Sequence, residues 1–454
     1  MPFTESLAGS AMVKIRFVDF TVSRDDNIKS LAKKARKGAK PRQFNMGLTA
    51  TVSSIIQDVR KNGDAALIRL GNRFDRTHFS RPDELFVKAH EFKHAYTALS
   101  AKQITSLKLA LQQIRWLARS QMKRYKPVNY RTPLGFVIKE RFEPLGRIGG
   151  YVPGGLAAYP STVLMICGPA IESRVGEIIL ATPPRPDGSI NESVLVAADL
   201  CGVRDILKGG GAQAIAALAF GTHSINRANL IAGPGNEFVT EAKRQVSGMG
   251  AASIDMLAGP TELLVVANGD VDPRLVAEDL ISQAEHGNRT ICGVISESDE
   301  LISKVRSTVR SSRNRSRAEY IAESLFFSVK VRTADEALRF AHEFSPEHLE
   351  IMLPPGAYST SEKYHKLAKS AGLALVGENT PTSATDYIVG TNHILPTGGL
   401  AEREAGLSVE TFLKRVTTVY SSKRALHRSV EPLSVLASLE GLQNHALAAQ
   451  ARFI

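Results

Sequence analysis

The segment DILKGGGAQAIAALAFG (residues 205–221) contains a short apolar run, three consecutive glycines and a longer alanine-rich run. This pattern predicts a buried strand, a tight turn and a helix, in that order. Similar pairs flank it: EIILATPP (177–184) with SVLVAADLCG (193–202), and NLIAGPG (229–235) with NEFVTEAKRQV (236–246). Strands that alternate with helices predict a parallel sheet covered by helices. The expected fold class is therefore α/β.

The alternation continues after this region. LLVVAN (263–268) predicts a strand and PRLVAEDLISQAEHG (273–287) a helix, and a shorter series of the same kind follows. Before it, in residues 46–126, apolar residues recur at helical spacing. The chain from about residue 406 is also predicted to be helical, and the first 45 residues look like a polar, basic arm.

Composition limits the class of protein. The chain has 454 residues, of which 43% are hydrophobic and 22% charged, as in ordinary globular proteins with two to four structural units. No apolar run approaches the roughly 20 residues that span a bilayer, and the N-terminus lacks the pattern of a secretion signal. Cys167, Cys201 and Cys292 lie in apolar or small-residue surroundings. We therefore expect reduced cysteines and a cytoplasmic location.

The formal net charge of +12 is unevenly spread. KSLAKKARKGAKPRQ (29–43) and RSTVRSSRNRSR (306–317) contain no acidic residue, and such runs attract polyanions, including nucleic acid. However, no aromatic residue interleaves with them, and no zinc-finger or RRM signature is present. A solvated basic surface that attracts an anionic cofactor is the favoured interpretation, and nucleic-acid binding is not expected.

Three glycine-rich turns lie where a strand is predicted to end and a helix to begin: GGYVPGG (149–155), GGGAQ (209–213) and GPGN (233–236). Backbone N–H groups at such positions can receive a phosphate. GGGAQA fits the loose dinucleotide fingerprint, yet no acidic residue ends the next strand to hold a ribose hydroxyl. The three turns indicate a nucleotide site, and simple tight turns are the alternative.

The stretch FSPEHLEI (344–351) places a glutamate beside a histidine. Ser345 is expected to cap a helix that begins at Pro346, which would put Glu347 in the first turn. The positive end of the helix dipole would then favour neutral imidazole at His348, the form that a general base needs. The pair predicts either a simple helix start or an acid–base site.

Several histidines and carboxylates suggest a metal site. Gln283 and His286 in SQAEHG are three residues apart, hence on one face of a helix end. Imidazole nitrogen and carboxylate oxygen are zinc ligands, and further candidates follow in two later segments. The alternative for His286 is a simple interaction with the negative end of the helix dipole. The further candidates are Asp386, His393, Glu440 and His445.

A set of motifs resembles one known family. YVPGGLAAYPSTVLM, GGAQAIAALAFGT, GPGNEFVTEAKRQV, IDMLAGPTELLV, SQAEHG, SPEHLE, TNHILPT and EGLQNHA occur in this order and are similar to the histidinol dehydrogenase family, from about residue 51 to 454. The resemblance implies a zinc-dependent homodimer with shared active sites. It would oxidise L-histidinol through L-histidinal to L-histidine, the final step of histidine biosynthesis, and reduce two NAD.

The resemblance also implies a role for each matching residue. The zinc ligands would be Gln283, His286 and Asp386 of one subunit and His445 reaching in from its partner. NAD would contact Tyr151, Gln213 and Asn236. His348 would take the alcohol proton, and Glu347 would activate the water that hydrates the aldehyde. Substrate would contact Thr261, Gln283, His286, His348, Asp386, His393, Glu440 and His445.

The implied fold consists of two incomplete Rossmann-like domains, each a parallel sheet with helices on both faces, plus small helical N- and C-terminal pieces. We assign residues 1–45 to the basic arm, 46–150 and 262–405 to a first domain with the metal and base residues, and 151–261 to an NAD-binding domain. Residues 406–454 would form a helical tail that contributes to the partner's site.

Three other functions stay open. Many members of the family carry serine where this chain has Thr261, so a paralogous zinc and NAD dehydrogenase acting on another small hydroxy compound or amino alcohol is the first alternative. A zinc hydrolase that uses Glu347 without NAD is the second. Nucleic-acid binding through residues 1–45 is the third. No membrane partner is expected.

Overall fold

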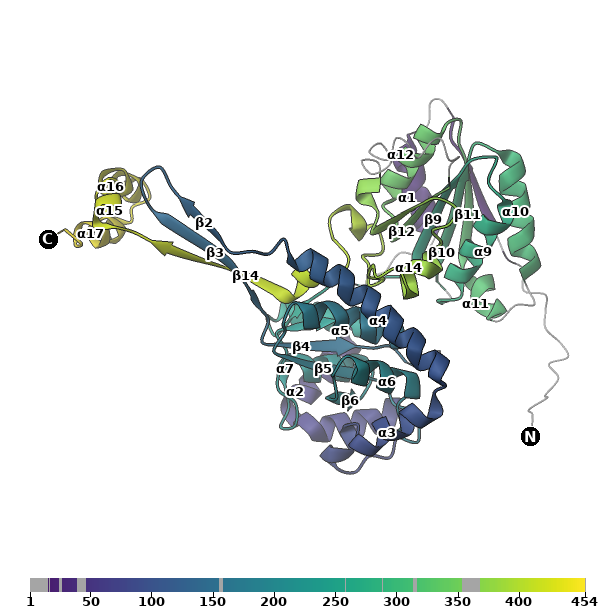
Figure 1. Cartoon of the computed structure of the whole chain (residues 1–454), viewed down its shortest axis with the longest axis horizontal. Coiled ribbons are helices and arrows are strands. Elements are labelled where there is room, and N and C mark those ends of the chain that lie inside the picture. The colour runs from purple at the N-terminus through teal and green to yellow at the C-terminus, as the bar shows by residue number, and fades with distance from the viewer. Residues whose placement is uncertain are drawn as a thin grey trace.

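The computed structural model describes residues 15, 17–23, 27–38, 46–154, 158–257, 259–287, 289–312, 317–352 and 368–453. Two α/β units and a long antiparallel stalk are visible, and the stalk carries the C-terminal helices at its far end (Figure 1). None of the helices within these ranges is long and apolar enough to cross a membrane.

The first unit contains a five-stranded parallel sheet with the order β6-β5-β4-β7-β8. Counted along the chain this order is 3-2-1-4-5, as in one half of a Rossmann fold with part of the next. Gly150 in β4 is needed for close packing, since a Cβ there would lie 2.6 Å from Leu180 Cδ2. The strands are β4 (Arg147–Tyr151), β5 (Glu177–Thr182), β6 (Ile206–Lys208), β7 (Leu230–Ala232) and β8 (Ser253–Ile254).

Helices cover both faces of this sheet. Successive strand residues point to opposite sides, and here the residues on both sides are apolar. Along β5, Leu180 joins one apolar cluster while Ile179 and Ala181 join the other. One cluster contains residues of α3 (Ala89–Ala98), α4 (Ala101–Met122), α5 (Pro160–Glu172) and α6 (Glu192–Leu200). The other contains residues of α2 (Met46–Phe74), α7 (Gly211–Phe220) and α8 (Glu237–Gly248).

The predicted assignment of residues 46–150 to the domain of residues 262–405 is wrong. The apolar faces of α2, α3 and α4 are buried against α7, α6 and α5, respectively. Strand β4, which ends this segment, is the central strand of the five-stranded sheet. The whole segment therefore belongs to the unit that contains the glycine turns.

The second unit contains a six-stranded parallel sheet with the order β1-β11-β10-β9-β12-β13. Without β1, this order is again 3-2-1-4-5, so both halves have the Rossmann-like topology that was expected. The strands are β1 (Phe17–Thr21), β9 (Glu262–Ala267), β10 (Ile291–Ser296), β11 (Leu325–Lys330), β12 (His348–Met352) and β13 (Leu373–Val376).

This sheet is also covered on both faces. Residues of α1 (Ile28–Gly38) and α12 (Ala334–Phe344) form one apolar cluster with the strands. Residues of α9 (Pro273–Ala284), α10 (Asp299–Ser311) and α11 (Ala318–Glu323) form the other. Asp272 caps α9 by accepting a hydrogen bond from the Arg274 backbone at 2.9 Å, and Pro273 occupies the first helical position.

The prediction of a free basic arm over residues 1–45 is wrong for β1 and α1. β1 pairs with β11 at the sheet edge, and α1 packs on α12. Arg36 of α1 reaches the buried Glu262 with a 3.0 Å ion pair, and its guanidinium lies 4.2 Å from the ring centroid of Phe344. Ile15 and Val22 beside β1 are buried in the core of the same unit, and residues 1–14, 16, 24–26 and 39–45 lie outside the described residues.

The predicted helix start in FSPEHLEI is also wrong. Helix α12 ends at Phe344, and Ser345 follows as its C-cap with a φ of 53°. After the turn at Pro346 the chain enters β12, which lies between β9 and β13. All five residues of β12 are buried, as expected for an interior parallel strand.

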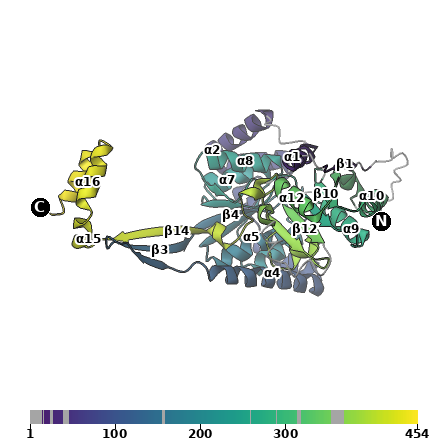
Figure 2. The same ribbon diagram turned by 90° about the horizontal axis from the view of Figure 1, so that it is seen from above.

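The C-terminal segment 406–454 is not wholly helical. β14 (Leu413–Tyr420) pairs antiparallel with β3 (Val137–Pro144), which pairs with β2 (Val128–Arg131). This three-stranded stalk projects from the body and carries three helices at its tip (Figures 1 and 2). They are α15 (Lys423–His427), α16 (Val430–Leu439) and α17 (Gln443–Gln450).

The contact between α1 and the second sheet can be tested through stability. Arg36→Ala removes the cation that faces the buried Glu262 carboxyl, and we expect unfolding to require roughly 3 kcal/mol less free energy. Burial raises the pKa of Glu262 to about 7, so its contribution to stability is lost as pH rises through that value. Loss of the cation raises this pKa further. The effect of Arg36→Ala should therefore be larger near pH 8 than near pH 6.

Urea unfolding at the two pH values measures this difference. The matched control is Lys29→Ala on the same helix, because Lys29 forms an exposed 3.7 Å ion pair with Glu343. Exposed pairs contribute about 0–1 kcal/mol. Equal losses for Arg36→Ala and Lys29→Ala would show that the pair with Glu262 does not hold α1 in place.

Candidate functional site

Most of the predicted metal and base residues meet at the amino-terminal edge of the six-stranded sheet. Neighbouring parallel strands begin at the same edge, and a helix that returns between them ends there. Thr261 precedes β9, Glu347 and His348 stand at the start of β12, and Gln283 and His286 lie at the end of α9. Asp386 comes from the short helix α14 (Thr382–Tyr387).

A chain of short hydrogen bonds links three of these residues. Gln283 Nε2 donates to Thr261 Oγ1 at 2.5 Å, and Thr261 Oγ1 donates to Glu347 Oε2 at 2.5 Å. The backbone N–H of Glu262 donates to the same Glu347 oxygen at 2.9 Å. The hydroxyl of Thr261 thus orients both the amide and the carboxyl, a role for which serine would be equally suited.

The donor atoms fit a metal ion. Thr261 accepts from Gln283 Nε2, which fixes the orientation of the amide. The buried Gln283 Oε1 has no hydrogen-bond partner among the described residues. His286 Nδ1 donates to the Gln283 carbonyl at 3.2 Å, which leaves Nε2 as a ligand atom 3.9 Å from Asp386 Oδ2. Amide oxygen, imidazole nitrogen and carboxylate oxygen are suitable for zinc.

This set is incomplete within one chain. Gln283, His286 and Asp386 offer three candidate ligands: an amide oxygen, an imidazole nitrogen and a carboxylate oxygen. In the described ranges no cluster of three or more histidine, cysteine, aspartate or glutamate side chains could hold a metal. The fourth position of a tetrahedral metal at this place would be filled by a water, the substrate or a further protein group.

Burial controls the protonation of the two candidate bases. His348 is 2% exposed, and desolvation lowers its pKa to about 4, so the imidazole is neutral near pH 7. The cause is burial in a strand and not the predicted helix N-terminus. His348 Nδ1 lies 3.8 Å from Glu347 Oε2, and Nε2 lies 4.0 Å from Asp386 Oδ1. Neither ring nitrogen has a hydrogen-bond partner within the described part of the chain.

The pKa of Glu347 is shifted upward, in the opposite direction to that of His348. Desolvation raises the pKa of its carboxyl to about 8, and the nearby carboxylates Glu262 and Asp386 act in the same direction. The hydrogen bonds from Thr261 and the Glu262 backbone partly oppose this rise. His393 lies in the same region, where its Nδ1 donates to the Asp386 carbonyl at 3.0 Å and desolvation lowers its pKa.

The predicted cofactor residues gather at the carboxyl edge of the five-stranded sheet. Tyr151 ends β4, Gln213 lies in the first turn of α7, and Asn236 caps α8. The Tyr151 hydroxyl accepts from the Gly211 N–H at 3.1 Å, and Asn236 Oδ1 accepts from Phe238 and Val239 N–H at 3.1 Å. The strand order reverses between β4 and β7, where open α/β sheets bind ligands.

An acidic residue that the sequence analysis missed lies at this edge. Asp75 follows α2, and its Oδ2 accepts from the Gly210 N–H at 3.4 Å. Its side chain also hydrogen bonds to Gln213, and burial raises the pKa of Asp75 to about 6. No sequence signal pointed to it, because the dinucleotide fingerprint places its acid at the end of a strand, whereas Asp75 comes from a helix of an earlier segment.

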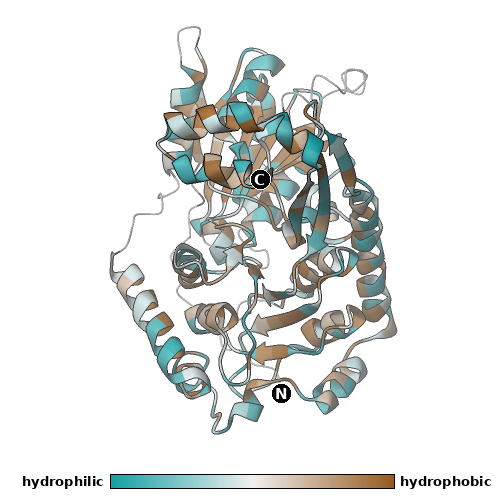
Figure 3. Cartoon of the chain, turned by 90° about the vertical axis from the view of Figure 1, so that its left-hand side faces the viewer, coloured by the Kyte–Doolittle hydropathy of each residue, from teal (hydrophilic) through white to brown (hydrophobic). Residues whose placement is uncertain are grey.

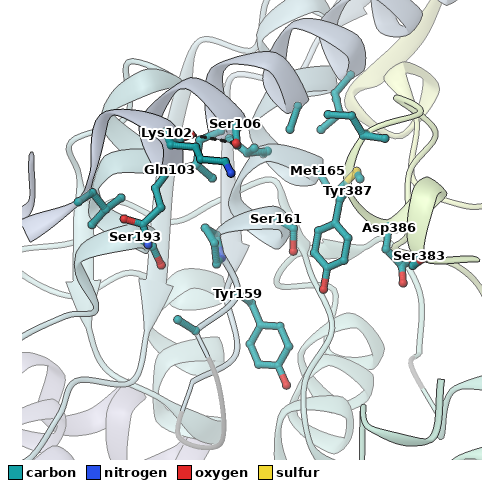
Figure 4. Close-up of a pocket in the computed structure, with 18 of the residues that line it drawn as sticks. Lys102, Gln103, Ser106, Tyr159, Ser161, Met165, Ser193, Ser383, Asp386 and Tyr387 are labelled. Atoms are coloured by element: carbon teal, nitrogen blue, oxygen red, sulfur yellow. Dashed lines mark hydrogen bonds between the residues drawn. The ribbon is translucent and has the colours of Figure 1, made fainter. Parts of the chain in front are cut away.

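A cleft of about 980 Å³ separates the two units and opens onto His286 and Asp386. Figure 4 shows Tyr159, Ser161 and Ser193 on the side of the first unit and Ser383, Asp386 and Tyr387 on the other. Lys102 and Arg317 add positive charge to the lining, while Glu285 and Asp386 add negative charge. Apolar side chains such as Leu107, Leu164 and Met165 make up much of the remaining lining.

Glu440 and His445 do not join this site within one chain. Glu440 is the C-cap of α16 and His445 lies in α17, at the tip of the stalk. Both are exposed there, far from the two sheets (Figure 1). Their predicted contact with substrate and metal requires a second copy of the chain.

Comparisons with known proteins agree with the motif pattern. The family model of histidinol dehydrogenase matches residues 39–453. The histidinol dehydrogenase of Xanthomonas axonopodis pv. citri is 41% identical over 406 residues, which cover 88% of this chain and 91% of that protein. That of Clostridium acetobutylicum is 39% identical, with 90% and 93% coverage.

A solved structure extends the similarity to the fold. The crystal structure of histidinol dehydrogenase from Elizabethkingia anophelis superposes with a TM-score of 0.88 at 30% identity, and the match covers 98% of this chain and 99% of that one. The similarity in sequence and in architecture leads to one conclusion. The chain belongs to the histidinol dehydrogenase family.

Proposed function

We propose that the protein oxidises L-histidinol through L-histidinal to L-histidine, using zinc and NAD, in the cytoplasm. The main support is that Gln283, His286 and Asp386 lie beside the buried pair Glu347 and His348, in a chain that belongs to this family. The cytoplasmic location is supported by Cys167, Cys201 and Cys292, which are buried free thiols.

The unpartnered Gln283 Oε1 supports a resident cation, because a buried acceptor without a donor is costly. Gln283, His286 and Asp386 would hold the zinc, with His445 of a second copy as the fourth ligand. When bound, the metal would hold the substrate's amino alcohol and stabilise negative charge on its oxygen.

His348 is the base for the first oxidation. Its neutral, buried imidazole can accept the proton of the alcohol O–H while the carbon's hydrogen leaves as hydride to the nicotinamide ring. The proton thus goes to the protein and the electron pair to NAD. No described residue hydrogen bonds to either ring nitrogen of His348, so the unprotonated nitrogen of the neutral imidazole is free to accept the proton.

Glu347 serves the second oxidation, in which water adds to the aldehyde before hydride leaves again. Its Oε2 is fixed by Thr261 and the Glu262 backbone, so the carboxyl is directed toward the site. A base must be ionised, whereas burial and the charge of Asp386 keep the pKa of Glu347 near 8. A cation beside Asp386 would offset that charge and favour the carboxylate.

NAD is proposed to lie along the carboxyl edge of the five-stranded sheet, at Tyr151, Gln213 and Asn236. The cleft that opens onto His286 and Asp386 is lined by Ser161 and Ser193, at the starts of the helices α5 and α6 that follow β4 and β5. Asp75 adds a carboxylate at the same edge, where a ribose hydroxyl could donate to it.

The C-terminal helices support a homodimer with shared sites. Val435, Leu436, Leu439 and Leu447 are large apolar side chains that are more than half exposed. Figure 3 shows brown, apolar segments on the helices around the C-terminus. Surfaces of this kind mark protein–protein contacts. A second copy would cover them and bring Glu440 and His445 to the incomplete metal site.

Incubation of the purified protein with L-histidinol and NAD tests the activity. We expect two NADH for each L-histidine formed, measured by absorbance and by amino-acid analysis. No NADH at millimolar L-histidinol would refute the proposal. Reduction of NAD by a different amino alcohol alone would identify a paralogous dehydrogenase, and turnover without NAD would identify a hydrolase.

The two bases should separate by reaction step. His348→Ala should slow both oxidations by on the order of 10²–10⁴-fold, the usual cost of removing a general base. Glu347→Ala should chiefly slow the second, because only that step needs an activated water. Single-turnover rates with L-histidinol and, separately, with L-histidinal measure the difference. Equal losses in both steps for Glu347→Ala would contradict the assigned role.

Subunit exchange tests the shared site. His445→Ala and His286→Ala should each be inactive alone, but in their heterodimer one site carries both defects and the other carries none. Random exchange of equal amounts should restore about a quarter of wild-type activity, since half of the dimers are mixed. The control mixture is His286→Ala with Asp386→Ala, in which every site keeps a defect.

Exchange itself is checked by native mass spectrometry. If mixed dimers form but the first mixture stays as inactive as the control, His445 does not act on a partner's site. This outcome would be independent of which alcohol is the substrate.

A further inference from the structure

A second layer of acidic groups lies behind the site, and the proposed chemistry does not use it. Glu350 follows His348 by two residues on β12, so both side chains leave the same face of the strand. Glu350 is only 1% exposed, although its strand neighbours Val265 and Leu375 are apolar. A carboxyl in such surroundings is costly unless its oxygens are hydrogen bonded.

One oxygen of Glu350 fixes the helix that carries Asp386. Glu350 Oε1 accepts from the backbone N–H of Thr382 at 2.8 Å and from Thr382 Oγ1 at 2.6 Å. Thr382 is fully buried and is the first residue of α14. The carboxyl therefore caps this helix from outside, and the position of Asp386, in the same six-residue helix, depends on it.

The other oxygen of Glu350 faces the helix that carries the other two ligands. Oε2 accepts no hydrogen bond from an N–H or hydroxyl group in the described ranges. The Glu350 carboxyl instead forms a carboxyl–carboxyl hydrogen bond with Asp279. Asp279 lies on α9, four residues before Gln283 and seven before His286, hence on the same side of the helix.

Two hydrogen-bonded carboxyls must hold a proton between them. Burial raises the pKa of Glu350 to about 8 and that of Asp279 to about 6, and the exposed Glu278 beside Asp279 adds to the second rise. The pair therefore holds one proton at neutral pH.

We propose that Glu350 and Asp279 are positioning residues, which share one proton and hold α14 and α9 together so that Asp386 stays beside Gln283 and His286. The inference rests on the proposed metal site but concerns residues that touch neither metal nor substrate. It joins three elements, β12, α9 and α14, through two side chains. The pair sets the distance between ligands that are far apart in the sequence.

Amide substitutions separate this role from mere packing. In Glu350→Gln the amide oxygen can still accept from Thr382, and the amide N–H₂ can donate to Asp279 without any shared proton. Glu350→Ala removes both bonds and leaves the buried Thr382 N–H without its acceptor and the half-buried Asp279 carboxyl without Glu350. The two variants therefore differ in the contacts that hold α14 to α9.

Zinc affinity provides the first readout. The full-length proteins are stripped of metal, and zinc binding is measured by competition with a coloured chelator, without any assay of activity. Glu350→Ala should weaken zinc binding by about 10–100-fold, as loss of a residue that supports metal ligands usually does. Glu350→Gln should bind zinc nearly as wild type does. Glu278→Ala, an exposed neighbour on α9, is the matched control and should also be unchanged.

Hydrogen exchange of α14 provides the second readout. Backbone amides of Thr382–Tyr387 should exchange faster in Glu350→Ala than in wild type and as slowly as wild type in Glu350→Gln. The proposal fails if Glu350→Ala leaves both zinc affinity and exchange unchanged, or if Glu350→Gln loses as much as Glu350→Ala. A wild-type protein that binds no zinc would refute the metal site alone, and the exchange rates would still decide whether the pair holds α14.

Discussion

The concentration of buried carboxyls at one edge of the six-stranded sheet is the constraint on which the site depends. Glu262, Glu347 and Glu350 are each at most 6% exposed, and Asp386 lies beside them. Charges in such a place need a cation, a proton or several hydrogen-bond donors. Arg36 neutralises Glu262, a proton bridges Glu350 to Asp279, and backbone and hydroxyl donors hold Glu347. Under the proposed function, Asp386 is the carboxylate that remains for the metal.

The two sheets have the same strand order but use opposite edges. In the first unit, the candidate cofactor residues lie at the carboxyl ends of the strands, where most open α/β sheets bind ligands. In the second, both candidate bases stand at the amino end of β12, and Thr261 stands at that of β9. Each unit can therefore contribute a different part of the reaction to the cleft between them.

The sequence predicted the alternating elements of residues 177–296 well, because the hydrophobic period changes sharply at each glycine turn. The prediction failed where one sequence pattern fits two structures, and where the outcome depends on contacts between elements far apart in the sequence. The Ser345–Pro346 pair suited a helix start, yet the chain uses Ser345 to leave a helix. Helical spacing in residues 46–126 showed that the helices are buried, but not against which sheet. The convergence of Gln283, His286 and Asp386 was expected from resemblance alone. The contacts of Asp75, Glu350 and Asp279 depend on packing between elements and had no local signal.

The edge pairing of β1 has a consequence for the time course of folding during synthesis. Phe17 pairs with Phe326, so the first strand of the second sheet must wait for a neighbour that is translated much later. At the usual 5–20 residues per second, this interval is roughly 15–60 s. The first unit needs only residues 46–254 for its sheet and its covering helices, so these can form before the second unit begins to close, and Ile394, Leu407 and Phe412 join its core later. The ribosome therefore imposes an order of assembly, with the glycine-turn half as the earlier and β1 as a late addition.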